Sequence, residues 1–151
     1  MQIYLVQHGQ AQPKDIDPSC SLTERGRRET ERVAALAARL DLNLRQIRHS
    51  GKTRAEGTAA ILGAALSPAE GVTATSGLAP LDDVRPVAEG LAGDVMLVGH
   101  MPFMARLAGL LLTGDPERAV IKFCNSAIVC LAREDGRWQV TWILTPEMAG
   151  A

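Results

Sequence analysis

Short apolar runs alternate with longer amphipathic stretches along most of this chain. Residues 3–6 (Ile-Tyr-Leu-Val) and 95–98 (Val-Met-Leu-Val) contain no charged side chain, which is typical of strands buried on both faces of a parallel sheet. From Thr23, a predicted N-cap, to about Leu40, apolar positions recur at helical spacing. Strands that alternate with helices predict an α/β fold.

The remaining elements follow from the same patterns. Further strands are expected over residues 43–49, 72–75, 125–132 and 138–144, and further helices over residues 50–66, 84–91 and 102–112. Asp83 is the expected cap of the helix at 84–91. The last two strands flank Asp135-Gly136, a strong hairpin signal. The sheet is therefore predicted to be mostly parallel and to end in an antiparallel edge hairpin.

Composition narrows the functional classes. With 151 residues, the chain is long enough for one domain with a sizeable core. A net charge of -1 and an aromatic content of 3% argue against a nucleic-acid-binding surface, and the apolar runs are too short to span a membrane. The first strand begins with no basic leader before it, and the three cysteines form no C-x-x-C pair. These features predict a cytoplasmic protein.

Two histidines stand in matching contexts. His8 ends the first apolar run and precedes Gly9, while His100 ends the run at 95–98 and follows Gly99. If both runs are parallel strands of one sheet, the two imidazoles emerge at the same carboxyl edge, where open α/β sheets bind ligands. Either histidine alone is more simply explained as a strand end that bonds to a loop. The pair favours phosphoryl chemistry or metal binding.

A basic turn precedes the helix at 50–66. Gly51-Lys52-Thr53 resembles part of a nucleotide-binding P-loop, but the glycine required five positions earlier is replaced by Gln46, so we reject that interpretation. A basic turn at a helix N-terminus still suits an anion. Arg54 lies in the first helical turn, where the helix dipole disfavours a cation. This position suggests a ligand; the alternative is a surface arginine paired with Glu56.

These groups fit phosphoryl transfer without a metal or cofactor. A neutral imidazole at position 8 is a competent nucleophile near pH 7 and can carry a phosphoryl group covalently. The planar fork of Arg54 would bind two phosphate oxygens. His100, protonated by the bound dianion, would neutralise a third oxygen.

Four motifs occur in the order found in the histidine phosphatase superfamily, whose fold is phosphoglycerate mutase-like. They are Gln7-His8-Gly9, Leu22-Thr23-x-x-Gly26, Ser50-x-x-x-Arg54-Ala55-x-x-Thr58-Ala59 and Val98-Gly99-His100-Met101-Pro102. The chain resembles the small SixA-like phosphohistidine phosphatase branch over nearly its whole length. The resemblance implies one domain over residues 1–151, built as a three-layer α/β/α sandwich. It also implies that His8 is the phosphorylated nucleophile, with Gly9, Arg54 and His100 in the phosphate pocket.

One residue departs from the family motif. The superfamily has Arg-His-Gly where this chain has Gln7-His8-Gly9. Gln7 can donate hydrogen bonds to phosphate, but it carries no charge and no planar fork. By analogy with the removal of oxyanion donors, the loss would cost about 10²–10³ in rate. The chain is then either a slow enzyme or a phosphoprotein-binding relative. Lys14, Arg25 and Lys52 are the candidates for compensating the lost charge.

Whether the enzyme needs a proton donor depends on the leaving group of its substrate. Larger members of the superfamily use a Glu or Asp to protonate an alkoxide leaving group, and here Asp82 and Asp83 are the candidate acids. A phosphohistidine substrate relaxes this need, because imidazole is far less basic than an alkoxide. The loops are short, which suits an open site that a protein can reach. The expected substrate is the phosphohistidine of a phosphotransfer domain in a bacterial phosphorelay.

Two other enzyme classes fit the sequence less well. His49 also ends a strand, so three histidines would offer a catalytic zinc set in a metal-dependent hydrolase; well-spaced carboxylate ligands are missing. A cysteine phosphatase loop requires Cys and Arg separated by five residues, and Cys20 and Arg25 are separated by four. Because those carboxylate ligands are missing, no metal site is predicted.

Overall fold

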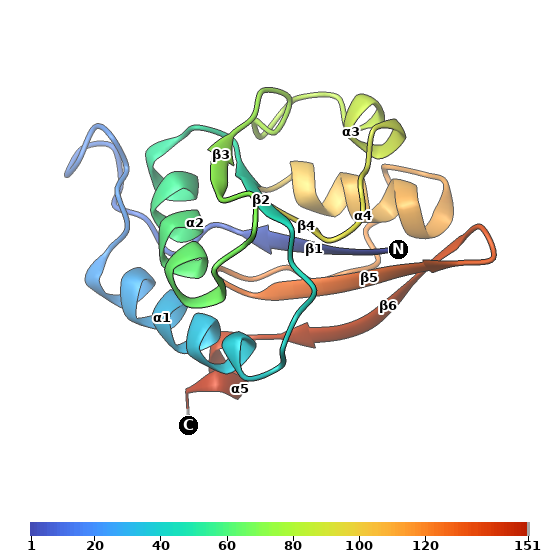
Figure 1. The fold of residues 1–151 in the computed structure, drawn as a ribbon. Helices are drawn as coiled ribbons and strands as arrows, with labels where there is room; N and C mark the ends of the chain where they lie inside the picture. Colours follow the sequence, from blue (N-terminus) through green and yellow to red (C-terminus); the bar gives the residue numbers. More distant parts are fainter. Residues whose placement is uncertain (151) are drawn as a thin grey trace.

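A computed structural model describes residues 1–150 as a mixed six-stranded sheet with helices on both faces (Figure 1). The strands are β1 (Gln2–Gln7), β2 (Gln46–His49), β3 (Val72–Ala74), β4 (Val95–Gly99), β5 (Ile128–Glu134) and β6 (Arg137–Leu144). The helices are α1 (Glu24–Ala38), α2 (Thr53–Leu66), α3 (Arg85–Glu89), α4 (Phe103–Thr113) and α5 (Pro146–Ala149). The predicted α/β architecture is confirmed.

The strand order is β3-β2-β4-β1-β5-β6, so β1 lies inside the sheet between β4 and β5. The first four strands in this order run parallel, and β5 and β6 run antiparallel to their neighbours. β1 and β4 are paired in a register that places Gln7 opposite Gly99. The two strands therefore end at the same level, and the residues that follow them leave the sheet side by side.

Alternation along the central strands creates two separate cores. Ile3 and Leu5 face α3 and α4 and share a core with Phe103 and Leu107 of α4. Tyr4 and Val6 point to the opposite face, where the core includes residues of α1 and α2. Because the middle of β1 is buried on both faces, its sequence is continuously apolar. These two cores separate the three layers of the predicted sandwich.

The helices begin where local chemistry allows. The Thr23 side chain accepts a hydrogen bond from the backbone N–H of Gly26 at 2.9 Å, which confirms it as the N-cap of α1. α2 begins at Thr53, three residues later than predicted, because the preceding turn includes Gly51 with φ +90°. None of the helices within residues 1–150 has the length and apolar character needed to cross a bilayer.

Two predicted elements are shorter or shifted. α3 spans Arg85–Glu89 instead of 84–91, and its N-cap is Val84. Asp83 accepts a hydrogen bond from the N–H of Arg85 at 3.0 Å, one position outside the predicted capping arrangement. β5 begins at Ile128, not at 125, because Ser126 has φ +67° and turns the chain.

The C-terminal hairpin is confirmed. β5 and β6 pair antiparallel as far as Glu134 and Arg137. Asp135 and Gly136 connect them with φ values of +51° and +74°. Positive φ at both central residues is what a tight hairpin turn requires.

Candidate active site

The structure brings His8 and His100 together at the carboxyl edge of the sheet. His8 follows β1 and His100 follows β4, and the His8 backbone N–H donates to the Gly99 carbonyl at 2.9 Å. Their ring centroids are 5.1 Å apart, with an angle of 51° between the ring planes. His100 is only 1% exposed, whereas His8 is partly exposed. The parallel pairing of two buried strands thus produces the juxtaposition predicted from the sequence.

A backbone carbonyl determines which nitrogen of His8 is free. Nδ1 of His8 lies 2.7 Å from the carbonyl oxygen of Gly9. A carbonyl oxygen only accepts hydrogen bonds, so Nδ1 carries the proton and Nε2 keeps its lone pair. Burial lowers the pKa of His8; the bond to Gly9 raises it, and the charge of Arg54 lowers it. The ring is therefore neutral at pH 7, with Nε2 available as a nucleophile.

His100 is held neutral more strongly. Burial lowers the pKa of His100 to about 3, and the charges of Arg54, of His8 when it is protonated, and of Lys52 act in the same direction. Its Nε2 lies 2.6 Å from the hydroxyl oxygen of Ser50. Its Nδ1 is buried and has no hydrogen-bond partner within residues 1–150. An anion bound beside this ring would offset the positive charges of Arg54 and Lys52 and favour protonation.

The positive charge of Arg54 acts on both histidines. It lies in the first turn of α2, is half-buried, and its charge lowers the pKa of His8 and of His100. No carboxylate lies within 4.0 Å of it in the described part of the chain, so the alternative ion pair with Glu56 is not formed. A half-buried guanidinium without a counter-ion, next to two neutral imidazoles, is suited to bind an anion.

Gln7 occupies the last position of β1. Its backbone carbonyl accepts a hydrogen bond from the N–H of Ser126 at 2.9 Å. The side-chain Oε1 is buried and has no hydrogen-bond partner among residues 1–150. The structure therefore places this amide at the same edge as the histidines without tying its oxygen to another group.

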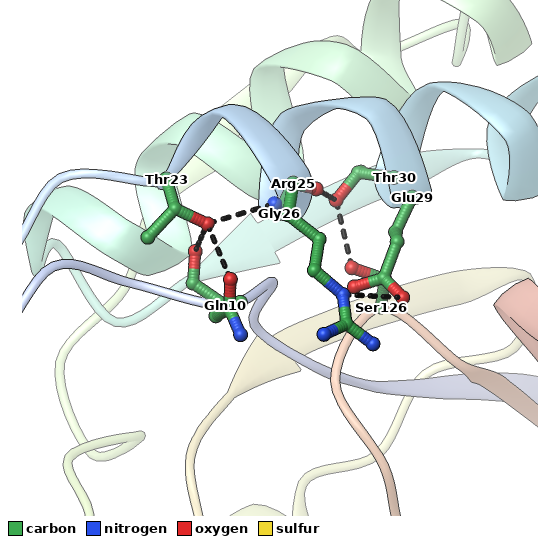
Figure 2. A network of polar contacts seen from close by, with 7 residues as sticks. All are labelled: Gln10, Thr23, Arg25, Gly26, Glu29, Thr30 and Ser126. Carbon is green, nitrogen blue, oxygen red and sulfur yellow. Dashed lines mark hydrogen bonds and ion pairs between the residues drawn. The ribbon is translucent and has the colours of Figure 1, made fainter.

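The three candidates for compensating charge lie in different surroundings. Lys52 precedes α2, and its charge lowers the pKa of His100, so it is close enough to affect the site. Arg25 is directed toward Glu29, with Nε 3.6 Å from the carboxylate, as Figure 2 shows. Lys14 is exposed in the loop after β1. Of these, Lys52 is the candidate that the structure supports.

Both candidate acids accept hydrogen bonds from backbone N–H groups close to them in sequence. Asp82 accepts a hydrogen bond from the N–H of Ala79 at 2.9 Å, and Asp83 accepts one from Arg85. Both line a cavity of about 680 Å³ whose other walls include Leu91 and Val95, and neither His8 nor His100 lines it. Neither carboxylate is among the charges that shift the pKa of either histidine. A role for them as acids stays a prediction.

His49 does not join the pair in a metal centre. It is 6% exposed at the end of β2, and its Nδ1 accepts a hydrogen bond from the N–H of Gly51 at 3.1 Å. Within residues 1–150, no three His, Cys, Asp or Glu side chains gather as a metal site would require.

Sequence reasoning assigned no role to several residues that contact the site. Ser50 contacts His100, and the Asn125 side chain donates to the His8 carbonyl at 2.8 Å. Thr58 accepts from the N–H of Gly9 at 2.8 Å. Ser50 and Thr58 were visible in the motif around Arg54, but only as part of a resemblance. Asn125 was hidden because the pattern assigned it to a strand.

Known proteins were compared by sequence and by structure. A scan against family models gives no match, and no curated protein matches the sequence significantly. Solved structures do match. The protein histidine phosphatase SixA complexed with tungstate is 25% identical, with a TM-score of 0.83 and 97% of both chains covered.

More distant matches have the same fold. A candidate phosphohistidine phosphatase SixA from Agrobacterium tumefaciens is 24% identical, with a TM-score of 0.78 over 96% of this chain and 97% of that one. A phosphoserine phosphatase from Entamoeba histolytica, complexed with 3-phosphoglyceric acid, is 14% identical, with a TM-score of 0.71 over 95% and 96%. These similarities show that the chain has the fold of SixA and of other phosphatases of the histidine phosphatase superfamily.

Proposed function

We propose that this protein is a phosphatase that acts through a phosphohistidine intermediate and removes phosphate from phosphohistidine in another protein. The observation that carries the proposal is the pairing of His8 and His100, 5.1 Å apart, beside the unpaired Arg54. Similarity to SixA, which was solved with the phosphate analogue tungstate, supports a site for a tetrahedral oxyanion. The proposal includes one domain spanning the chain.

In the first step, the Nε2 lone pair of His8 attacks phosphorus and the bond from phosphorus to the substrate nitrogen breaks. The electron pair of that bond stays on the leaving ring. A phosphohistidine whose other ring nitrogen carries a proton leaves as neutral imidazole, so no protein acid is required. The phosphorylated ring of His8 becomes cationic, and the Gly9 carbonyl stabilises its Nδ1–H.

In the second step, water attacks phosphorus from the side that the leaving group has vacated. The bond from phosphorus to Nε2 breaks, its electron pair returns to His8, and both hydrogens of the water leave with dihydrogen phosphate. Arg54 and protonated His100 hold the equatorial oxygens in both steps. Two displacements at phosphorus, in which Nε2 of His8 is first the nucleophile and then the leaving group, thus restore the free enzyme.

The proposed substrate is a histidine-phosphorylated phosphotransfer domain. A P–N bond fits a site in which neither candidate acid lies beside the histidines: Asp82 and Asp83 are engaged by backbone N–H groups and line a cavity that neither ring lines. A P–O ester would need a proton donor for its alkoxide, and no such donor is positioned by these contacts. Phosphohistidine should therefore be hydrolysed faster than simple phosphomonoesters.

A second candidate function follows from Gln7. The site lacks the family arginine, so a protein that binds phosphate or a phosphoprotein without turnover is the alternative. Binding of phosphate with no release from a phosphorylated protein would select this alternative over the enzyme.

The deciding experiment incubates the protein with a phosphorylated phosphotransfer domain and follows phosphate release. Wild type should release phosphate, and His8→Ala should abolish release because it removes the nucleophile. Gln7→Arg should raise the rate by about 10²–10³ if the missing charge limits catalysis. Unchanged or lower turnover in Gln7→Arg would disprove the charge deficit, and equal turnover of small phosphomonoesters would count against the P–N substrate.

A further inference from the structure

Three fully buried hydroxyl groups surround the backbone of Gly9, directly after the proposed nucleophile. Thr30 belongs to α1, Thr58 to α2, and Ser126 to the turn before β5, and all three are 0% exposed. Hydroxyls rarely stay in a protein interior unless they are hydrogen-bonded. Each of these three hydroxyls, which come from distant parts of the chain, should therefore have hydrogen-bond partners.

Thr58 uses both its donor and its acceptor. Its oxygen accepts from the N–H of Gly9 at 2.8 Å, and its hydrogen goes to the carbonyl of Arg54, also at 2.8 Å. The second bond is the common contact of a helical threonine with the residue four positions earlier. The first bond is not local, because it joins residues 49 positions apart. One hydroxyl thus connects the loop of His8 to the helical turn that carries Arg54.

Thr30 and Ser126 close the other side of the glycine. Thr30 donates to the Gly26 carbonyl at 2.7 Å, so Ser126 must be the donor in the 2.8 Å contact between the two hydroxyls (Figure 2). A Cβ at position 9 would lie 2.8 Å from the Thr30 oxygen and 3.0 Å from the Ser126 oxygen. The space around Gly9 therefore admits no side chain, and the backbone has little freedom to shift.

The Gly9 backbone also contacts the ring of His8. Its N–H is held by Thr58, and its carbonyl accepts from Nδ1 of His8 at 2.7 Å. A displacement of this residue would change the direction of the Nδ1 hydrogen bond and therefore the orientation of Nε2. In near-attack geometry, a misplacement of about 1 Å costs as much as about 10² in rate.

We propose that Thr58 is a positioning residue, whose hydroxyl aligns Nε2 of His8 with the guanidinium of Arg54 by tying Gly9 to the first turn of α2. This inference rests on the proposed phosphatase function and adds a residue that acts through the nucleophile without touching the phosphate. A threonine that only packs in the core would need its methyl group; a positioning threonine needs its hydroxyl.

The test compares Thr58→Val, which keeps the shape and removes the hydroxyl, with Thr58→Ser, which keeps the hydroxyl. In Thr58→Val, kcat for phosphate release should fall at least about 10-fold with KM changed less than about 2-fold. Thr58→Ser should keep kcat within about 3-fold of wild type. If Thr58→Val does not fold, Thr58→Ala takes its place with the same expectation.

Thr113→Val is the matched control. Thr113 in α4 makes the same local bond, from its hydroxyl to the Gly109 carbonyl at 2.8 Å, and none of its side-chain hydrogen bonds within residues 1–150 reaches the loop that follows β1. Its replacement should leave kcat unchanged. Equal losses in Thr58→Val and Thr58→Ser, or no loss in Thr58→Val, would overturn the positioning role.

A second readout separates this inference from the proposed function. The bond to Gly9 raises the pKa of His8, so loosening Gly9 in Thr58→Val should move the NMR titration of His8 to lower pH. Thr58→Ser and Thr113→Val should titrate like wild type. This shift is measurable even if wild type shows no turnover, in which case the phosphatase proposal fails alone. An unchanged titration in Thr58→Val would reject the positioning role.

Discussion

Two imidazoles stay uncharged at pH 7 beside a half-buried arginine, and this determines the chemistry at the residue scale. In the proposed mechanism, His8 must be neutral to attack phosphorus, and burial together with Arg54 lowers its pKa. His100 has a pKa of about 3 for the same reasons, and its charge becomes favourable only next to an anion. In the proposed mechanism, Arg54 therefore has two roles: it binds the substrate and it keeps the His8 nucleophile neutral.

The pKa of His100 predicts a pH dependence of stability. Unfolded His100 binds a proton near its ordinary pKa of about 6.5, whereas the folded residue does so only near 3. Between these values the unfolded state binds more protons, so the free energy of unfolding should decrease as the pH falls. In His100→Asn the decrease should be smaller. Urea unfolding at about pH 7 and about pH 5 measures it; an equal decrease in both chains would contradict the assignment.

At the element scale, α1 is fastened to the loop that follows β1. Thr23 caps the helix and donates to the Gln10 side chain at 2.7 Å, as Figure 2 shows. Gly26 allows close approach, because a Cβ there would overlap the backbone of Gln10. Gln10 lies two residues after His8, so the first turn of α1 supports the same loop that carries the proposed nucleophile.

Gly26→Ala should therefore destabilise the protein and slow phosphate release, although alanine favours helix by about 1 kcal/mol over glycine. Gly57→Ala is the matched control, since a Cβ at that helical position meets only the Leu22 side chain at 3.3 Å. Thermal unfolding and turnover should be lowered far more in Gly26→Ala than in Gly57→Ala. Similar effects in the two variants would show that the approach of α1 to Gln10 is not tight.

At the scale of the whole molecule, two hydrophobic cores share one sheet. The core facing α3 and α4 and the core facing α1 and α2 both include residues of β1 and β4. Loss of either layer would expose one face of the central strands to water. The two cores are therefore expected to lose their structure together, as one domain.

Scanning calorimetry should show a single unfolding transition, with the calorimetric enthalpy equal to the van't Hoff enthalpy. Tungstate should raise the transition temperature, because a ligand that binds only the folded state stabilises it. Two resolved transitions would contradict the single domain. Replacement of His8 by Ala should reduce the shift produced by tungstate, which links the stabilisation to the proposed site.

The sequence alone determined the six strands, the helices α1 to α4 and their order, but not the short helix α5. Continuous apolar runs identified β1 and β4, because strands buried on both faces cannot contain charges, and Asp135-Gly136 identified the hairpin, because its turn needs positive φ. His8 and His100 were found for the same reason, since each follows such a run. These signals are local, and a local pattern can be recognised in the sequence without knowledge of the fold.

Only the tertiary structure decided which neighbours these elements acquire. β1 pairs with β4 although β2 is closer in sequence, and this pairing sets the distance between the two histidines. Asn125 was assigned to a strand, and Thr58 was named only as part of the motif around Arg54. Their contacts with His8 and Gly9 span 117 and 49 positions. Such hydrogen bonds depend on how the layers of the fold pack, so the hydrophobic periodicity of a single segment cannot predict them.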